Sequence, residues 1–513
     1  MRGPRAGEKA RPLLRAIAGL AVATVFLAST AMISGATTAG NDWSKYLFDA
    51  SGSGYNSETT ITSSSAPSLA TRTGWPASPG GGNTISTQPV VANSLVYIGS
   101  WNGNEYALCA LSCTTKNHHK TITHSAGYLW WSQNLGQTNG GTSCNPQIAG
   151  VASTPAVATV TIAGDSSPSS VLFVGGGGNN TAGGGSAQMY ALDALTGRIR
   201  WQMALGTAPA HFMWSSPIVY NGSVYVGIAS FGDCPLVQGQ VVQLNVTSGA
   251  IQHAFNVVPN GCTGGGVWSS PAIDQTDGSL YFATGNAGTC PNSEPYSVAV
   301  IKLRTSDLSY VSSWQVPASE QTGDSDFGAA VTLFSGTVSP GAAALQLAGI
   351  TNKNGTYYVF DRTNLSAGPV KRILVAQPGE CPQCGQGGIS PSAYDGQSLY
   401  VAAGNTTMNG QFCQGSLSAY NPNDLSGPVW QHCMTSGPVL GAVTAAPGIA
   451  VVGEGSYIIM VETGSGATIF RAAVNSLNTS NPAIFYGAPT ISHGVLYEGD
   501  TFGNLYAYSI NGA

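Results

Sequence analysis

Charged side chains are rare in this chain of 513 residues, since Asp, Glu, Lys and Arg make up 8% of it. The stretch TNKNGTYYVFDRTNL at 351–365 nevertheless carries Lys353, Asp361 and Arg362. Lys353 comes directly before an Asn-Gly pair, which favours a tight hairpin turn. Two interpretations are open: a solvated lysine at a surface turn, or a cation aimed into a binding site.

Glycine and aromatic residues indicate the class of fold that must position such a residue. The chain has 68 Gly, and Phe, Trp and Tyr make up 9% of it. This composition supplies turn residues and apolar material for a core, and it excludes a disordered chain. No helical periodicity of useful length follows residue 40. We therefore expect an all-β fold.

The first 40 residues have the pattern of a secretory signal peptide. Five basic residues precede a mostly apolar run from Ala16 to about Ile33, and a segment of small residues follows. We expect cleavage at about residues 31–40 and export to the periplasm or the extracellular space. The alternative is a retained membrane anchor, because the run approaches the roughly 18–20 residues of a spanning helix. No later segment could span a membrane, so none is expected after cleavage.

The rest of the chain is acidic. Beyond residue 40 it holds 13 basic and 22 acidic residues, without basic clusters. This balance argues against nucleic acid or anionic lipid as a partner.

Ten cysteines, an even number, indicate disulfide bonds in an exported protein. Three pairs are close in sequence: Cys109 with Cys113, Cys381 with Cys384, and Cys413 with Cys433. Spacing alone leaves the connectivity open.

One pattern recurs along the chain: a small-residue or Pro start, an alternating apolar strand, a Gly, a second strand such as YALDA, then often Thr-Gly and a strand with Trp. Eight copies follow one another at spacings of roughly 46 to 66 residues. They begin at Ser86, Ala152, Trp214, Val267, Phe327, Gly388, Gly441 and Gly487. Each copy has room for four short strands, the unit of a propeller blade.

The last copy ends after about its second strand, at the C-terminus. The segment LATRTGWPAS at 69–78 has the Trp-bearing strand that this copy lacks. An N-terminal strand that completes the last blade closes the ring and removes open sheet edges. We predict an all-β, eight-bladed β-propeller of four-stranded blades, closed in this way, as a single domain over residues 41–513.

The T-G-x-x-x-W blade pattern and several local strings resemble the quinoprotein alcohol dehydrogenases. These are eight-bladed propellers that hold pyrroloquinoline quinone (PQQ) and a calcium ion on the axis. The repeat resemblance covers nearly all of residues 43–510, and the resemblance at the site is confined mainly to residues 233–362.

Two strings carry most of the resemblance at the site. VWSSPAIDQTDGSLYFATGN implies that Trp268 is the floor beneath the quinone ring and that Asn286 is a calcium ligand. TGDSDFGAAVTLF implies that Asp326 is the catalytic carboxylate beside calcium, with Asp324 as its acidic neighbour.

Two further strings complete the implied site. TNKNGTYYVFDRTNL places Lys353 where the family uses a Lys or Arg to reach the quinone oxygens. ASFGDCPLVQGQVVQLN is more weakly similar, and it implies that Asp233 is the carboxylate ligand of calcium.

The implied roles are chemically consistent. Calcium prefers hard oxygen ligands, and a planar quinone buries well against an indole face. Nearby cations polarise quinone carbonyls, and an Asp beside the substrate hydroxyl can take its proton. Taken alone, Trp268 could also be blade packing, Asn286 a turn residue, and Asp324 and Asp326 loop-capping carboxylates.

The chain departs from the family in its cysteines. The dehydrogenases usually carry two adjacent cysteines joined in a ring above the quinone, and this sequence has no Cys-Cys pair. The best positional match is Ser143-Cys144, which makes Cys144 a candidate contact to the cofactor.

Two functions therefore remain open. The first is an exported PQQ-dependent alcohol dehydrogenase-like enzyme, which oxidises an alcohol or a hydroxylated polymer with PQQ and calcium and passes electrons to an external acceptor. The second is a non-catalytic propeller of the same superfamily that binds protein segments as an assembly scaffold. The polar residues gathered at family spacing favour the enzyme.

Overall fold

The structure is a computed structural model of the chain. It describes residues 41–117, 120–142, 144–178, 187–474 and 484–513. The chain divides into two units, Met1–Ser34 and Gly35–Ala513, and the described residues all lie in the second. The expected signal peptide lies outside the described residues. Within the described part, no helix is long and apolar enough to cross a membrane.

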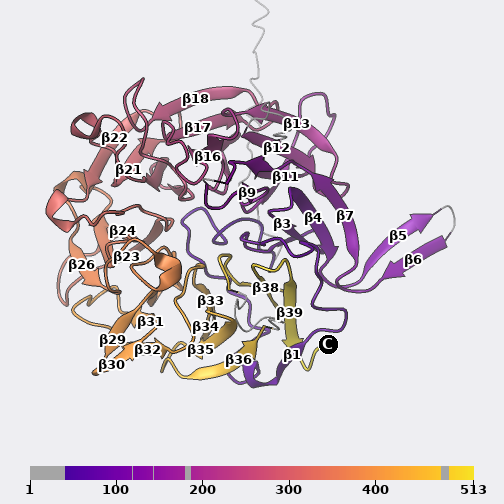
Figure 1. Cartoon of the computed structure of the whole chain (residues 1–513). Coiled ribbons are helices and arrows are strands. Elements are labelled where there is room, and N and C mark those ends of the chain that lie inside the picture. Colours follow the sequence, from indigo (N-terminus) through magenta and orange to yellow (C-terminus); the bar gives the residue numbers. More distant parts are fainter. Residues whose placement is uncertain (1–40, 118–119, 143, 179–186, 475–483) are drawn as a thin grey trace, which may run out of the picture. The chain divides into compact units, whose positions relative to one another are not determined.

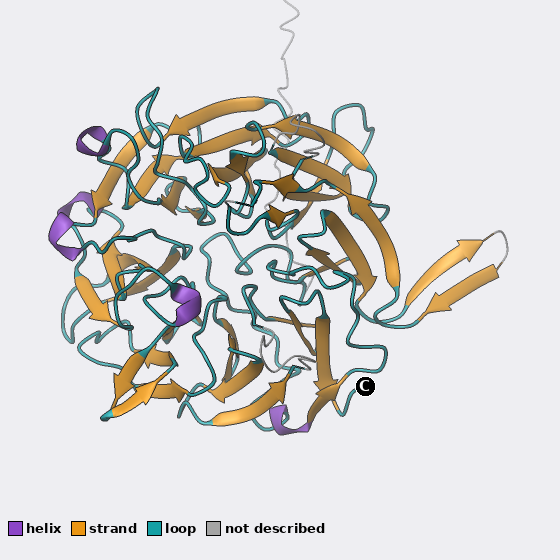
Figure 2. Ribbon diagram, in the orientation of Figure 1, coloured by secondary structure: helices purple, strands orange, loops and turns teal. Residues whose placement is uncertain are grey.

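Eight antiparallel sheets follow one another as the blades of a propeller (Figures 1 and 2). In the first seven blades the strands follow chain order from the axis outward. The first strand of a blade is short and mostly buried, as in β19 (Ala272–Asp274), because it lies against its neighbours at the axis. The fourth strand is largely exposed, as in β18 (Ile251–Asn256).

Blade 1 consists of β2 (Val90–Ala92), β3 (Leu95–Gly99), β4 (Asn104–Cys109) and β7 (Leu129–Asn134), and blade 2 of β10 (Ala156–Val160), β11 (Ser169–Gly176), β12 (Gln188–Asp193) and β13 (Ile199–Ala204). Blade 3 consists of β15 (Ile218–Tyr220), β16 (Ser223–Ser230), β17 (Gln240–Asn245) and β18, and blade 4 of β19, β20 (Ser279–Ala283), β21 (Ala299–Arg304) and β22 (Tyr310–Gln315).

Blade 5 consists of β23 (Thr332–Gly336), β24 (Leu345–Thr351), β25 (Thr356–Asp361) and β26 (Lys371–Leu374), and blade 6 of β27 (Ala393–Tyr394), β28 (Leu399–Ala403), β31 (Gly415–Tyr420) and β32 (Trp430–Met434). Blade 7 consists of β33 (Thr444–Ala446), β34 (Ile449–Glu454), β35 (Tyr457–Glu462) and β36 (Thr468–Ala473), and blade 8 of β37 (Thr490–Ser492), β38 (Val495–Gly499), β39 (Leu505–Ile510) and β1 (Leu69–Thr71).

The connections carry a few additional short elements. The extra strands are β14 (His211–Phe212) on β16, and the ribbons β5 (Cys113–Asn117) with β6 (Lys120–His124), β8 (Thr138–Asn139) with β9 (Ile148–Ala149), and β29 (Thr406–Met408) with β30 (Gln411–Cys413). Short 3-10 helices lie at η1 (Ala66–Ser68), η2 (Pro291–Ser293), η3 (Ala318–Glu320), η4 (Leu365–Ala367) and η5 (Pro382–Cys384).

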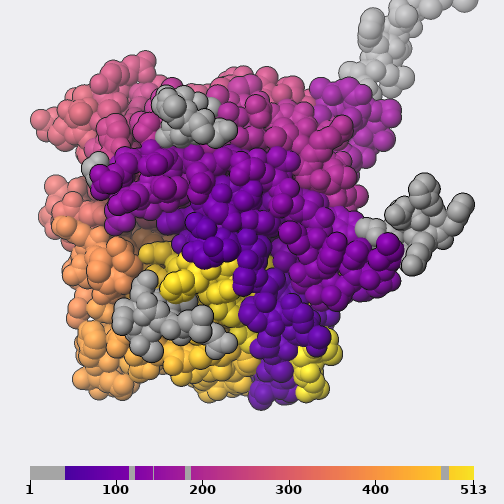
Figure 3. All heavy atoms as spheres, turned by 45° about the vertical axis from the view of Figure 1, so that its right-hand side comes forward, coloured from indigo at the N-terminus to yellow at the C-terminus, as the bar shows by residue number. Residues whose placement is uncertain are grey.

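The N-terminal strand β1 closes the ring. It pairs antiparallel with β39, with Leu69 opposite Ile510 and Thr71 opposite Tyr508, and so supplies the outer strand of the eighth blade. Figure 3 shows the indigo N-terminal atoms against the yellow C-terminal atoms. The predicted fold class is therefore confirmed, including closure by the N-terminal strand.

The recurring Trp and Gly explain how neighbouring blades dock. The Trp131 indole on the outer strand of blade 1 lies against Gly197 in the Thr-Gly turn of blade 2, and its N–H donates to Ala194 O at 2.9 Å. Gly197 has φ 72°, and a side chain there would collide with the indole. Trp201 and Gly249 repeat this contact one blade later.

A segment near the N-terminus winds around the axis and binds most of the blades. We call residues 41–56 the axial segment. Its hydrogen bonds reach the first strands of seven blades, namely β2 from Trp43, β10 from Ser44, β19 from Ala50, β23 from Ser51, β27 from Ser53, β33 from Gly54 and β37 from Asn56. The backbone groups that face the axis thereby find partners, which a buried backbone requires.

Candidate active site

A cavity of about 600 Å³ lies on the axis. Every blade contributes to its wall, from Trp101 in blade 1 to Leu440 in blade 7 and Tyr486 before blade 8, which is possible only at the axis. Tyr46 of the axial segment also lines it. Six predicted site residues share this wall: Asp233, Trp268, Asn286, Asp324, Asp326 and Lys353.

Blades 4 and 5 present the polar residues from loops at one end of their strands. Lys353 lies in the turn between β24 and β25, where Gly355 adopts φ 83°. The turn is fastened to the segment before β23, since the Lys353 N–H donates to Asp326 O at 3.3 Å and the Asn352 amide donates to Ser325 O at 2.6 Å. The lysine is thus held against the aspartates by backbone as well as side-chain contacts.

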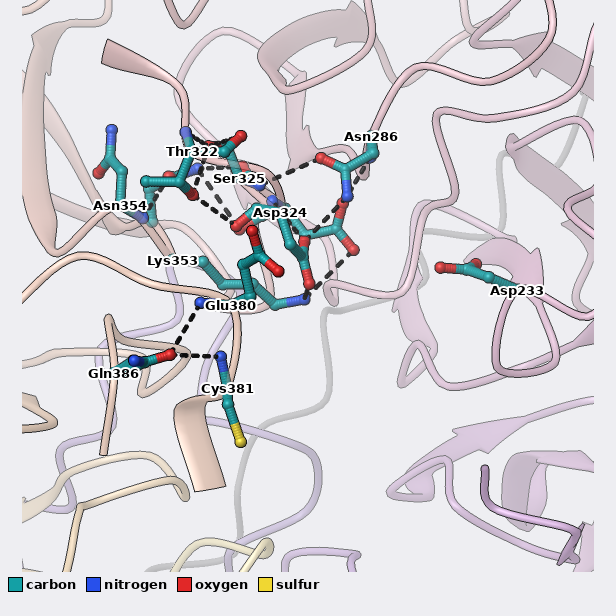
Figure 4. A network of polar contacts seen from close by, with 12 residues as sticks. Asp233, Asn286, Thr322, Asp324, Ser325, Lys353, Asn354, Glu380, Cys381 and Gln386 are labelled. Atoms are coloured by element: carbon teal, nitrogen blue, oxygen red, sulfur yellow. Dashed lines mark hydrogen bonds and ion pairs between the residues drawn. The ribbon is translucent and has the colours of Figure 1, made fainter. Parts of the chain in front are cut away.

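Lys353 is buried in an ion pair with two carboxylates. Its Nζ lies 2.7 Å from Asp324 Oδ2 and 3.5 Å from Asp326 Oδ2, and the residue is 8% exposed (Figure 4). The interpretation as a solvated turn lysine is therefore wrong. The pair lies on the cavity wall, so its charges face whatever the cavity binds.

Asn286 joins this cluster from the loop after β20. Its Nδ2 donates to Asp324 Oδ1 at 2.9 Å, and its Oδ1 accepts the Ser325 N–H at 3.2 Å. Its backbone N–H donates to Asp326 Oδ1. These bonds fix the orientation of the amide and leave Asp326 Oδ2 as the oxygen of that carboxylate that the backbone does not engage.

The cluster has unusual proton affinities. The pKa of Asp326 is raised to about 6, chiefly by burial and also by the charges of Asp324 and Asp233, while Lys353 opposes the rise. For Lys353, burial favours the neutral amine, but Asp326 and Asp324 outweigh it, so its pKa is raised. The lysine therefore remains charged, while Asp326 titrates near the range in which a general base works best.

Trp268 forms the wall beside the lysine. The Lys353 ammonium lies 5.2 Å from the centre of the Trp268 ring, and Gly328 packs against the ring where any side chain would collide. The indole N–H is buried, and no hydrogen-bond partner for it is found among the described residues. Trp268 is therefore not only blade packing, because its ring also meets the cavity.

Asp233 faces the same space from the other side. It lies in the loop after β16, and Figure 4 shows its carboxylate directed across a gap toward the Lys353 cluster. Its influence on the pKa of Asp326 agrees with this placement. Glu380 also lines the cavity near Asp324, and nothing in its sequence context marked it beforehand.

All ten cysteines are paired. The three pairs that are close in sequence form disulfides, and the others are Cys144–Cys234 and Cys262–Cys290. Cys144 does not itself line the cavity, but Asn145 beside it does, as does Asp233 beside its partner. Ser143, the other half of the predicted contact, lies outside the described residues.

An aromatic wall, which we define as Trp101, Trp214, Phe212 and Phe231, occupies the side of blades 1 to 3. The Trp101 and Trp214 rings lie 6.0 Å apart edge to face, and both line the cavity. Trp214 had a sequence signal, because its W-S-S-P string matches that of Trp268. Trp101 had none.

The described residues suit a hard cation and a flat aromatic ring. Four carboxylates face the cavity against one ammonium group, so a divalent cation would relieve their repulsion. Oxygens of Asp233, Asn286 and Asp326 are of the type that calcium prefers. The half-buried indole of Trp268, which lines the cavity, suits a planar ring.

Comparisons with known proteins agree with this fold. The PQQ_2 family model, described as outer membrane protein assembly factor BamB, matches residues 120–364. A polyvinylalcohol dehydrogenase from Pseudomonas sp is 28% identical over 123 residues. That match covers 19% of this chain and only 19% of the length of the dehydrogenase.

Three solved structures share the fold, and each match covers 92% of this chain. A europium-containing methanol dehydrogenase is 15% identical, with 98% of that chain covered and a TM-score of 0.66. The quinohemoprotein alcohol dehydrogenase from Comamonas testosteroni is 14% identical, with 81% covered and a TM-score of 0.66. Quinohemoprotein alcohol dehydrogenase ADHIIG from Pseudomonas putida HK5 is 14% identical, with 81% covered and a TM-score of 0.69.

These identities establish the fold and not the chemistry. Together with the repeat, they show that the chain is a propeller similar to those of the PQQ-dependent alcohol dehydrogenases, as the sequence predicted.

Proposed function

We propose that the protein is an exported PQQ-dependent oxidoreductase that oxidises an alcohol or a hydroxylated polymer and passes electrons to an external acceptor. The observation that carries the proposal is the buried cluster of Lys353, Asp324, Asp326 and Asn286 beside Trp268 on an axial cavity. Five disulfides and the signal-like N-terminus support export.

The site residues fall into two groups, one for calcium and one for PQQ. Asp233, Asn286 and Asp326 would hold calcium through oxygen atoms. Trp268 would lie under PQQ, with Lys353 at its oxygens and the loop of Cys144 nearby. When bound, PQQ supplies the redox chemistry, which protein side chains do not provide.

The chain's own part in the reaction is to orient the alcohol and to move its proton. Asp326 accepts the hydroxyl proton at Oδ2, because Oδ1 already accepts the Asn286 N–H. Asp324 holds the Lys353 ammonium at 2.7 Å, which keeps its charge beside the Trp268 face. Trp101 and Trp214, the two members of the aromatic wall that line the cavity, contact the carbon chain of the substrate.

Reconstitution tests the proposal directly. The purified protein is mixed with PQQ and Ca²⁺, and the quinone absorbance and the reduction of a dye by primary and secondary alcohols are measured. We expect bound quinone at micromolar protein and alcohol-dependent dye reduction. Absence of bound quinone overturns the proposal.

A second candidate function is a propeller that binds protein segments, because the matching family model is described as an assembly factor. Such a scaffold has no use for a lysine buried between two aspartates at an axial cavity. A protein that binds no quinone in the experiment above would favour the scaffold.

A further inference from the structure

Three features of the structure restrain Asp233: its backbone conformation, a side-chain hydrogen bond and a disulfide at the next residue. Its backbone adopts φ 57°, a left-handed conformation that an Asp tolerates better than most side chains. The Ser230 hydroxyl donates to its Oδ1. The next residue, Cys234, is joined by a disulfide to Cys144, which lies 90 positions earlier.

That disulfide joins two walls of the cavity. Cys144 belongs to the loop between β8 and β9, and Cys234 belongs to the loop between β16 and β17. Cys144 is 5% exposed and packs against Phe212 and Phe231 of the aromatic wall. The loop of Asp233 is thereby anchored in a buried aromatic cluster rather than left at the surface.

The two loops also meet closely through their backbones. Gly232 adopts φ 61°, and a side chain there would lie 2.9 Å from Asn145 O. Asn145 and Gly232 both line the cavity, next to Cys144 and Asp233. The disulfide and this contact set the position of the loops on the cavity wall.

Electrostatics shows why Asp233 needs such restraint. Its carboxylate faces Asp324 and Asp326, whose compensating cation, Lys353, is already engaged at 2.7 and 3.5 Å. Among the described residues that line the cavity, no other cation is present. On a free loop, repulsion would turn the Asp233 carboxylate away from the cluster.

We propose that the Cys144–Cys234 disulfide and Ser230 are positioning elements that hold Asp233 as a cation ligand against this repulsion. A ligand fixed before the ion arrives binds it more tightly, since no loop has to be ordered on binding. The inference rests on the proposed function, because it presupposes a cation between Asp233 and Asp326.

Terbium luminescence tests the inference without any turnover. Tb³⁺ takes calcium-type oxygen sites, and nearby indoles sensitise it. Ion-free full-length protein is titrated with Tb³⁺, and Ca²⁺ is then added to displace it. We expect the Cys144→Ala/Cys234→Ala variant to bind Tb³⁺ about 10-fold or more weakly than the wild type, as removal of outer-shell partners typically does.

Two further variants separate positioning from general stability. Cys413→Ala/Cys433→Ala removes a disulfide of blade 6 outside the cavity wall, and we expect it to lower the melting temperature but leave the terbium affinity unchanged. Ser230→Ala keeps both disulfides, and we expect it to weaken terbium binding with little loss of stability. If the double cysteine variant fails to fold, the terbium affinity of Ser230→Ala tests the positioning role by itself.

The outcomes are distinct. Wild-type affinity for terbium in both Ser230→Ala and the folded Cys144→Ala/Cys234→Ala variant overturns the positioning role alone. Absence of terbium and calcium binding in the wild type overturns both this inference and the proposed function.

Discussion

The two sides of the axial cavity differ in kind. Blades 4 and 5 supply two carboxylates, an amide and a buried lysine beside one indole, whereas blades 1 to 3 supply two indoles, Trp101 and Trp214, and one carboxylate, Asp233. The charged side is dense in hydrogen bonds, and the aromatic side is held by ring packing and a disulfide. In a chain with 8% charged residues, such concentration in one sector supports the proposal that chemistry occurs on that side and substrate contact on the other.

The largest effect is expected from neutralising Asp326, the proposed general base on the charged side of the cavity. We expect Asp326→Asn to lower alcohol-dependent dye reduction about 100-fold or more, since a general base contributes roughly 10²–10⁴-fold. Asp307→Asn alters an outer turn of blade 4, where Asp307 Oδ1 accepts the Ser309 N–H, and it should leave the rate unchanged. Equal rates in the two variants contradict the assignment.

Removal of the lysine tests whether its charge serves the cavity or only the fold. Lys353→Met leaves Asp324 and Asp326 uncompensated, and we expect a loss of about 3 kcal/mol in the free energy of unfolding together with loss of quinone binding. Lys302 is also buried, and it pairs at 3.0 Å with the exposed carboxylate of Asp277, outside the cavity.

Lys302→Met is therefore the matched control. It should destabilise the protein in denaturant titrations but retain quinone absorbance after reconstitution. If both variants bind quinone equally well, Lys353 has only a structural role.

The aromatic side should affect binding rather than the chemical step. We expect Trp214→Ala to raise KM for long-chain alcohols about 10-fold, with kcat nearly unchanged, because burial of an aromatic face contributes roughly 1.5–3 kcal/mol. Trp130→Ala is the control: like Trp214, its indole N–H donates to a backbone carbonyl, but it lies outside the cavity. A fall in kcat with KM unchanged would show that the two sides do not divide the work in this way.

The smallest expected effect concerns a carboxylate that belongs to neither side. Glu105 is fully buried in blade 1, burial raises its pKa well above the usual value, and neither oxygen has a partner among the described residues. The folded protein therefore retains a proton that the unfolded chain releases above about pH 4.5. Stability contributed by this group is present at lower pH and is lost as pH rises.

We expect Glu105→Gln to melt about 2 °C or more above the wild type at pH 8 and within about 1 °C of it at pH 4. Thermal unfolding followed at the two pH values measures this difference. Glu462→Gln, at an exposed turn of blade 7, should show no such pH dependence. A partner lysine makes buried charge tolerable on the charged side, and Glu105 has none.

Much of this could be predicted from the sequence, for a physical reason. Strand alternation and the Trp–Gly docking contacts recur in several blades, so the local sequence pattern predicts the fold. It also predicts that an N-terminal strand closes the ring. Lys353, Asp326 and Asn286 were found because their loops resemble a known family.

What the sequence did not show depends on contacts between distant positions. The Cys144–Cys234 bond spans 90 residues, and no local pattern distinguishes it from other pairings. Glu380 lines the same cavity as Asp324 only because the loop before blade 6 contributes to the cavity wall. The axial segment has no periodicity, since its bonds to successive blades come at irregular intervals of one to six residues.

That axial segment has a consequence for how the chain is made. During synthesis it emerges before any of its partners, and the Asn56 amide bonds to Ile491 O, 435 residues later. Such distant pairing makes ring closure a late and slow step. Until the last blade has formed, the strand edges of the first blade stay exposed, and chaperones that bind such edges can act on them.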